Sequence, residues 1–145
     1  MQVTLRELIH EYPAHNGPFF QCADDVRDEL NHIAEASKEI FVAFYLDTKH
    51  RVIAREIIGV GIINASLIHP REVFRSAIFC NAQSIILAHN HPSGNIAPSS
   101  NDLDVTQLLI AAGNIIGIDV LDHVIVGGSE MHSMKENGEL KPGGA

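Results

Sequence analysis

The chain has 145 residues, of which 46% are hydrophobic and 19% are charged, so it is long and apolar enough for one domain with a core. This composition excludes a disordered chain, and no apolar run is long enough for a transmembrane helix, so we expect no membrane partner. The net charge of −8, without any run of Lys or Arg, argues against strong nucleic-acid binding.

The N-terminus and the cysteines together favour a cytoplasmic protein. The N-terminus lacks the basic segment and apolar core of a signal peptide. Cys22 and Cys80 form no C-x-x-C pair, and disulfides are rare in the cytosol. Both cysteines are therefore predicted to be free thiols.

The first half of the chain predicts a lead-in, a helix, a hairpin and a second helix. Residues 1–22 are interpreted as an extended lead-in outside the core, because prolines and a glycine interrupt them. Residues 23–38 predict a helix, since apolar residues recur at helical spacing and two aspartates lie near the start. Residues 39–47 and 52–63 predict the two strands of a hairpin, and Pro70 fits the first turn of a helix.

The second half continues the alternation of strands and helices. Residues 83–89 form a continuous apolar run that is typical of a buried strand. Residues 99–116 predict a helix, and residues 118–128 predict another strand. A last short strand and turn are expected at 130–140, followed by a frayed tail at 141–145. This order predicts an α/β layered domain with a mixed sheet.

Two histidines and an aspartate stand out at the end of the predicted central strand. His89 and His91 point to the same side, because residues i and i+2 of a strand share a face. Ten residues separate His91 from Asp102, which falls in the first turn of the next helix, and the intervening loop contains turn-forming residues. A His₂–carboxylate set suits a catalytic zinc that leaves its fourth position open to water. An ordinary polar loop is the alternative at this stage.

The same stretch resembles a known motif. From His89 to Asp102 the sequence H-N-H-P-S-G, followed by P-S-x-x-D, is similar to the zinc-binding motif of the RadC family, within the JAMM/MPN group of metal-dependent isopeptidases. The blocks "HPREVF" (69–74) and "DHVIVG" (122–127) resemble other RadC segments. The resemblance implies a three-layer MPN fold, similar in layout to cytidine deaminases. It also implies a Zn²⁺ cofactor on the two histidines and the aspartate, in a domain spanning 23–140.

The resemblance also implies roles for other residues. In the wider group, a glutamate general base opens the first strand after the first helix, and the family's E-x-F pattern begins here at Glu39. Glu56, on the paired strand, is the competing candidate. Ser99 matches the serine of S-x-x-D, whose hydroxyl helps to hold an oxyanion, and it could equally cap the helix. Asn90 lies where isopeptidases usually have Ser or Thr, and this asparagine is typical of the RadC branch.

The groups that support the metal ligands are not evident from the sequence. A metal-binding histidine usually donates its second ring nitrogen to a supporting group. His69 is interpreted as a capping or structural residue, and His123, which lies in a RadC-like block, is given no role.

The resemblance implies a zinc-dependent hydrolase that cleaves a peptide or isopeptide bond in a peptide or protein-conjugate substrate. Two alternatives are a non-catalytic MPN-type interaction module and a metal-dependent enzyme associated with DNA repair. Deamination is excluded because the chain lacks H-x-E and P-C-x-x-C. Longer RadC-like proteins carry an N-terminal helical region, and this chain is interpreted as a short form without it. Sheet edges of such small domains often pair, which would produce a homodimer.

Overall fold

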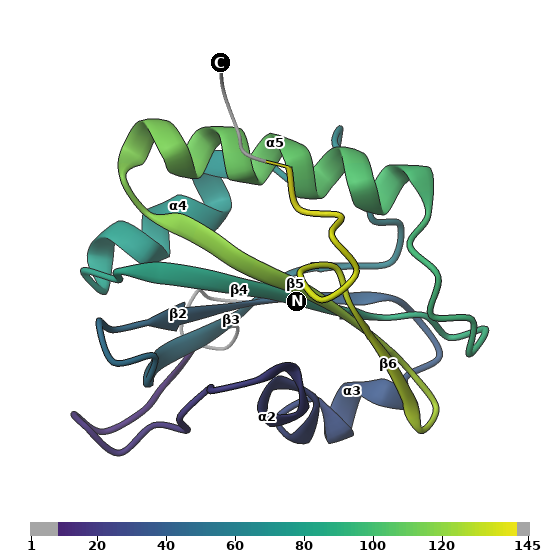
Figure 1. Cartoon of the computed structure of the whole chain (residues 1–145), viewed down its shortest axis with the longest axis horizontal. Helices are drawn as coiled ribbons and strands as arrows, with labels where there is room; N and C mark the ends of the chain where they lie inside the picture. Colours follow the sequence, from purple (N-terminus) through teal and green to yellow (C-terminus); the bar gives the residue numbers. More distant parts are fainter. Residues whose placement is uncertain (1–8, 142–145) are drawn as a thin grey trace, which may run out of the picture.

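The computed structural model describes residues 9–141 as a mixed sheet with helices on both faces (Figure 1). This architecture confirms the predicted α/β class with a mixed sheet. The elements are β1 (Ile9–Glu11), α2 (Ala23–Asp28), α3 (Asn31–Ala34), β2 (Ile40–Leu46), β3 (Val52–Val60), α4 (Pro70–Phe79), β4 (Ser84–Asn90), α5 (Ser100–Ile116), β5 (Asp119–Gly127) and β6 (Glu130–Ser133).

The sheet has the strand order β1-β3-β2-β4-β5-β6. Strands β2 and β3 form the predicted antiparallel hairpin, whereas β4 and β5 are parallel and are joined through α5. A parallel pair needs such a crossover, because its second strand must start at the same edge as the first. Every residue of β4 is buried, which explains its continuous apolar sequence.

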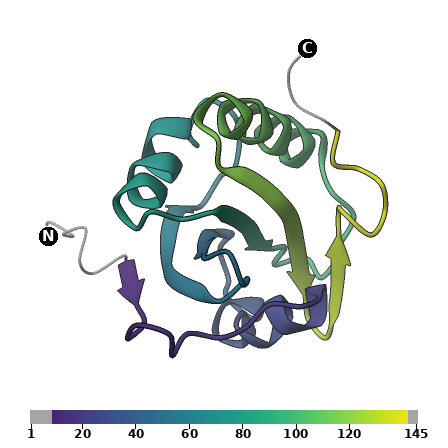
Figure 2. The ribbon, with the colours of Figure 1, turned by 60° about the vertical axis from the view of Figure 1, so that its left-hand side comes forward.

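Two separate cores fill the space between the sheet and its helices. Phe41, Tyr45 and Leu87 belong to the core beneath α4 and α5. Phe44 and Ala88 point the other way, into the core that contains α2 and α3. Figure 2 shows the sheet between these two helical layers. The alternation along each strand therefore produces the three-layer arrangement that the sequence resemblance implied.

The lead-in differs from the sequence interpretation. Strand β1 pairs antiparallel with β3, and Phe20 is only 3% exposed within the core that contains α2. Residues 9–22 therefore contribute to the sheet and to the core. The prolines and the glycine of this segment interrupt regular structure, but pairing at the sheet edge and burial of an aromatic side chain still hold it against the domain. Residues 1–8 lie outside the described part of the chain.

The helix predicted over 23–38 is two short helices. The backbone of Leu30, with φ −105° and ψ 5°, separates α2 from α3. Val26, Leu30 and Ile33 are all buried against the sheet, so the apolar spacing identified the buried face correctly. The path of the backbone between α2 and α3 depends on tertiary packing, which cannot be inferred from the periodicity of the sequence.

Helix α5 has well-defined ends. Ser99 is its N-cap: the Ser99 hydroxyl accepts the N–H of Asp102, while the Asp102 carboxylate accepts the N–H of Ser99. This reciprocal capping box satisfies two amide groups that a helix start leaves unpaired. The helix ends at Gly117, whose φ of 88° is left-handed and suits glycine. The capping box thereby fixes Asp102 in the first turn of α5, as predicted.

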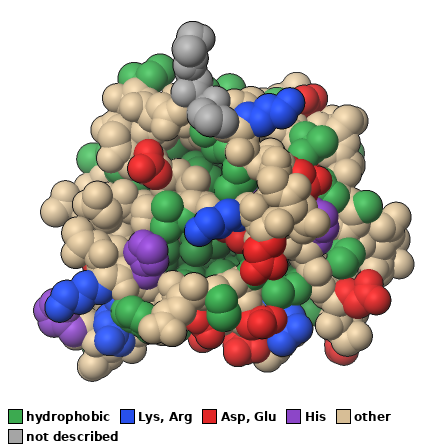
Figure 3. All heavy atoms as spheres, viewed as in Figure 1, with side chains coloured by type: hydrophobic (Ala, Val, Ile, Leu, Met, Phe, Trp, Pro, Cys, Tyr) green, Lys and Arg blue, Asp and Glu red, His purple; other side chains and the backbone are tan. Residues whose placement is uncertain are grey.

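The surface carries acidic side chains, in keeping with the net charge of −8. Helix α2 contributes Asp24, Asp25 and Asp28, and Figure 3 shows acidic side chains gathered beside basic ones in this lower region. Cys22 is exposed and Cys80 is half-buried, and both are free, as predicted. Among residues 9–141, no helix combines the length and apolar character that a membrane crossing requires.

Candidate metal centre

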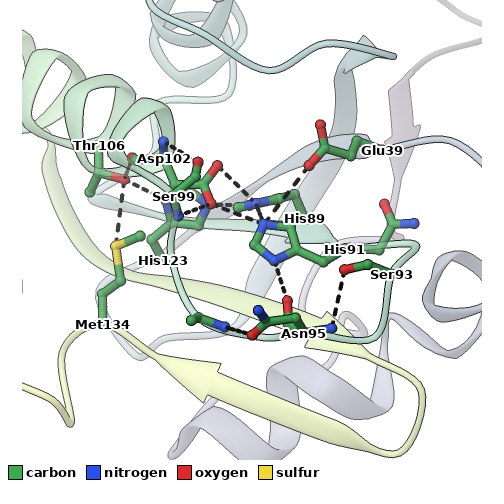
Figure 4. Close-up of polar contacts among 12 residues, drawn as sticks. Glu39, His89, His91, Ser93, Asn95, Ser99, Asp102, Thr106, His123 and Met134 are labelled. Atoms are coloured by element: carbon green, nitrogen blue, oxygen red, sulfur yellow. Dashed lines mark hydrogen bonds and ion pairs between the residues drawn. The ribbon is translucent and has the colours of Figure 1, made fainter.

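Three side chains from two elements converge at the end of β4 (Figure 4). His89 is the penultimate residue of β4, His91 follows the strand, and Asp102 lies in the first turn of α5. His91 Nε2 lies 2.9 Å from His89 Nε2 and 2.9 Å from Asp102 Oδ2. The second carboxylate oxygen, Asp102 Oδ1, lies 3.2 Å from His89 Nε2. The structure thus brings together the three residues that the sequence proposed as metal ligands.

The loop after β4 fixes the ring of His91. His91 Nδ1 lies 2.6 Å from the backbone carbonyl oxygen of Asn95. A carbonyl oxygen only accepts hydrogen bonds, so Nδ1 carries the proton and a neutral ring presents a lone pair at Nε2. The loop needs Gly94, whose φ is +84°, and it packs closely on Gly127, where an added Cβ would lie 2.9 Å from the carbonyl oxygen of Gly94.

A second set of contacts reaches His89 from inside the protein. His89 Nδ1 lies 2.7 Å from His123 Nε2, and His123 Nδ1 lies 2.5 Å from the hydroxyl oxygen of Thr106 in α5. All three side chains are buried. Burial, together with the nearby His89, lowers the pKa of His123 well below its ordinary value, so the ring of His123 is neutral at physiological pH.

The carboxylate of Asp102 is ionised in this setting. Burial alone would raise the pKa of Asp102, but the contact with His89 and the hydrogen bond from the Ser99 N–H hold that pKa below the usual range for aspartate. A charged, acceptor-only group therefore faces the two imidazoles. The capping box and the charge state together leave Asp102 with carboxylate oxygens that could bind a cation.

Glu39 approaches the same point from the exposed side. Its Oε1 atom lies 3.8 Å from His91 Nε2, and its side chain is 31% exposed, whereas that of His89 is fully buried. Glu39, His89 and His91 each offer one ligand atom within 4.8 Å of the others. The cluster is therefore open to solvent on the side of Glu39 and closed on the side of α5.

Asn90 holds the backbone on both sides of Glu39. It points away from the two histidines, as expected for the central residue of the triplet, and its Oδ1 accepts the N–H of Ile40 at 2.6 Å. Its Nδ2 donates to the carbonyl oxygen of Lys38 at 3.0 Å. The N–H of Gly61 also donates to the carbonyl oxygen of Glu39 at 2.8 Å. These bonds tie the position of Glu39 to the strand that supplies the histidines.

Glu56 occupies a different environment. It is 3% exposed, and the hydroxyl of Tyr45 lies 2.8 Å from its Oε2 and 3.0 Å from the carbonyl oxygen of Val73 in α4. Burial first, and then the charge of Glu56, raise the pKa of Tyr45 above its ordinary value. The structure therefore separates the two glutamates that the sequence left in competition, and it places only Glu39 beside the histidines.

The donor set fits a divalent metal ion. With its proton on Nδ1, the lone pair of His91 Nε2 faces the carboxylate of Asp102 at 2.9 Å. Two acceptors at this distance repel each other unless a proton or a metal ion lies between them. Imidazole nitrogen and carboxylate oxygen are ligands that zinc accepts in catalytic sites. A zinc ion is thus compatible with the charge and the chemistry of these residues.

Three residues of the site were not identified from the sequence. His123 lies in a RadC-like block to which the sequence assigns no role, and Thr106 lies within an ordinary amphipathic helix. For Asn90 the sequence indicates only the RadC branch and a side chain that points away from the histidines. Spacing shows which side chains share a face, but it does not show which element lies opposite. The general requirement for support behind a metal-binding histidine was the one available signal.

The three-layer α/β fold and the convergent His–His–carboxylate cluster define a JAB/MPN-type domain. A sequence profile of the RadC-like JAB domain matches residues 20–139, so the chain belongs to the RadC family. This match confirms the resemblance that the H-N-H-P-S-G motif indicated.

Curated relatives agree with this assignment. The "UPF0758 protein" of Alkaliphilus oremlandii is 54% identical over 137 residues, covering 94% of this chain and 56% of that protein. The proteins of the same name from Desulforamulus reducens and Methanococcoides burtonii are 46% and 52% identical, covering 94% and 73% of this chain. The chain spans 60% and 46% of the length of these two relatives. The shared name states no activity.

Proposed function

We propose that this protein is a zinc-dependent hydrolase that cleaves a peptide or isopeptide bond. The observation that supports this proposal most strongly is the position of Glu39. Its carboxylate lies on the solvent side of the His–His–Asp cluster, 3.8 Å from His91 Nε2. A non-catalytic metal site has no need for a partly exposed carboxylate at its open side, whereas hydrolysis needs a base there.

His89, His91 and Asp102 would hold the metal. When bound, zinc supplies Lewis acidity, which polarises a carbonyl group and makes water acidic near neutral pH. Two neutral imidazoles and one carboxylate leave a net positive charge on a divalent ion, which favours this chemistry. The buried side of the cluster excludes water, so only the side beside Glu39 is accessible to a substrate.

Glu39 would then transfer the proton. As general base, its carboxylate takes a proton from the attacking water, and as general acid it delivers that proton to the amine of the leaving group. The hydrogen bonds of Asn90 to Ile40 and Lys38 keep the carboxylate close to the reacting atoms. Ser99 Oγ accepts the N–H of Asp102 with a lone pair, which leaves the hydroxyl proton for a developing oxyanion.

Cleavage by zinc-loaded protein tests this proposal. Metal-depleted and zinc-loaded samples are incubated with a peptide library and with conjugates of ubiquitin-like proteins, and the products are identified by mass spectrometry in oxygen-labelled water. The expected result is new carboxyl termini that contain the label only in the zinc-loaded sample. Stoichiometric zinc without any cleavage would favour an interaction module, and steep salt-dependent DNA binding would favour a nucleic-acid enzyme.

A further inference from the structure

A continuous line of polar contacts runs behind His89 and returns to the backbone of Asp102. It passes from His89 Nδ1 to His123 Nε2 at 2.7 Å, and from His123 Nδ1 to Thr106 Oγ1 at 2.5 Å. The Thr106 hydroxyl then lies 2.6 Å from the backbone carbonyl oxygen of Asp102 (Figure 4). His89 is thus linked to the backbone of Asp102 through the side chains of His123 and Thr106. Neither of these two side chains is itself a candidate metal ligand.

The hydrogen bonds in this line have only one consistent direction. The carbonyl oxygen of Asp102 cannot donate, so the single proton of the Thr106 hydroxyl is committed to it. Thr106 Oγ1 must therefore accept from His123, which places the proton of that ring on Nδ1. In the neutral form of the His123 ring, a proton on Nδ1 leaves Nε2 as an acceptor, so His89 Nδ1 is the donor.

We propose that Thr106 and His123 are positioning residues that hold His89 in the tautomer whose Nε2 lone pair faces Asp102 and His91. The benefit of this tautomer rests on the proposed function, because a protonated Nε2 could not bind a metal ion. The direction of the hydrogen bonds behind His89 is a property of the chain and exists whether or not the protein is a hydrolase.

Burial makes this control effective. His89 and His123 are 0% exposed and Thr106 is 2% exposed, so water cannot substitute for any member of the line. The sulfur of Met134 lies 3.6 Å from Thr106 Oγ1, and because sulfur is a weak acceptor it does not compete with the carbonyl oxygen. His91, by contrast, is fixed by the backbone of the Asn95 loop. The two histidines therefore reach the same tautomer by independent routes.

Nitrogen NMR of the metal-free protein tests the tautomer directly. Long-range ¹H–¹⁵N correlation spectra of the histidine rings distinguish protonated from unprotonated nitrogens. The expected result is a His123 ring with its proton on Nδ1 and a bare Nε2. A His123 ring protonated mainly on Nε2 would overturn the proposal. This measurement needs neither zinc nor activity, so it stands even if the protein proves not to be a hydrolase.

Two variants of Thr106 test the consequence for metal binding. Thr106→Val is nearly isosteric and removes the hydroxyl, while Thr106→Ser retains it and is the matched control. We expect Thr106→Val to lose the single His123 tautomer and to weaken zinc binding by about 10–100-fold, with Thr106→Ser close to wild type. Unchanged zinc affinity and an unchanged His123 spectrum in folded Thr106→Val would contradict the proposal.

Discussion

Glu39 immediately precedes β2, and Glu56 lies within β3, the strand that pairs with β2. The two carboxylates nevertheless have different surroundings. Glu39 is partly exposed beside two histidines, and its backbone is held by Asn90 and Gly61. Glu56 is sealed beneath α4, with its carboxylate beside the hydroxyl of Tyr45. The first arrangement suits proton transfer to a substrate, and the second suits stability of the core.

The difference shows that residue type and strand position do not define a general base. A base must reach the reacting atoms and exchange its proton with them, which requires both exposure and a neighbouring reactive group. Glu39 meets both conditions. Glu56 meets neither, because its hydrogen-bond partner is a tyrosine of the core and its side chain is closed off from solvent.

The largest expected difference lies between two isosteric variants. Glu39→Gln should abolish measurable cleavage, with a loss of at least about 100-fold, because general acid–base catalysis contributes that much or more. Zinc should stay bound. Glu56→Gln, the matched control, should retain turnover within about twofold while it lowers thermal stability. Turnover assays with metal analysis of both variants check this, and full activity in Glu39→Gln would show that Glu39 is not the base.

Asn90→Ala should affect the surroundings of Glu39 without affecting the metal. Removal of the amide frees the backbone at Ile40 and Lys38, so the carboxylate of Glu39 is held less firmly. We expect turnover to fall by about tenfold, because small displacements of a catalytic group are costly, with unchanged zinc affinity. Parallel kinetic and zinc titrations measure this. A loss of zinc affinity in proportion to turnover would instead place Asn90 in support of the histidines.

Tyr45→Phe addresses the buried glutamate. The hydroxyl of Tyr45 contacts both Glu56 and the carbonyl oxygen of Val73, so its removal leaves buried acceptors unpaired. We expect a loss of about 1–3 kcal/mol in the free energy of unfolding, measured by urea denaturation. Turnover of the folded variant should match the wild type. A large fall in turnover would mean that the contact between Tyr45 and Glu56 affects the geometry of the candidate site.

The smallest effect concerns stability at alkaline pH. The raised pKa keeps the Tyr45 phenol protonated in the folded protein, whereas the phenol of the unfolded chain ionises near pH 10. The unfolded state therefore binds fewer protons above that pH, and stability should decrease by up to about 1.4 kcal/mol per pH unit from this group. Unfolding curves of wild type and Tyr45→Phe at several pH values isolate the contribution. Parallel curves would show that Tyr45 does not contribute.

Local patterns predicted most of the fold and the residues that converge at the end of β4. The strands were evident from continuous or alternating apolar runs, and Ser99 and Asp102 follow the spacing of a capping box. His89 and His91 share a face by strand geometry alone. These features depend on residues close together in the sequence, so the sequence contains the information needed to predict them.

Features that depend on distant contacts could not be predicted. The β4–β5 pairing shifts register between Ile85 and Ile86. As a result, Val120 packs with the core beneath α4 and α5, while Val124 packs with the core that contains α2 and α3. A β-bulge of this kind reverses the alternation and turns His123 towards α5. The environments of Glu39 and Glu56 likewise depend on which helix covers each strand. The periodicity of a single segment does not show which helix will cover it.

The central claim is that His89, His91 and Asp102 form one metal centre. Anomalous diffraction from crystals of the zinc-loaded protein, collected at the zinc absorption edge, tests it most directly. We predict one peak about 2.0–2.2 Å from His89 Nε2, His91 Nε2 and a carboxylate oxygen of Asp102, with Glu39 on its open side. A peak held by other residues, or no peak at this cluster in zinc-saturated crystals, would contradict the claim.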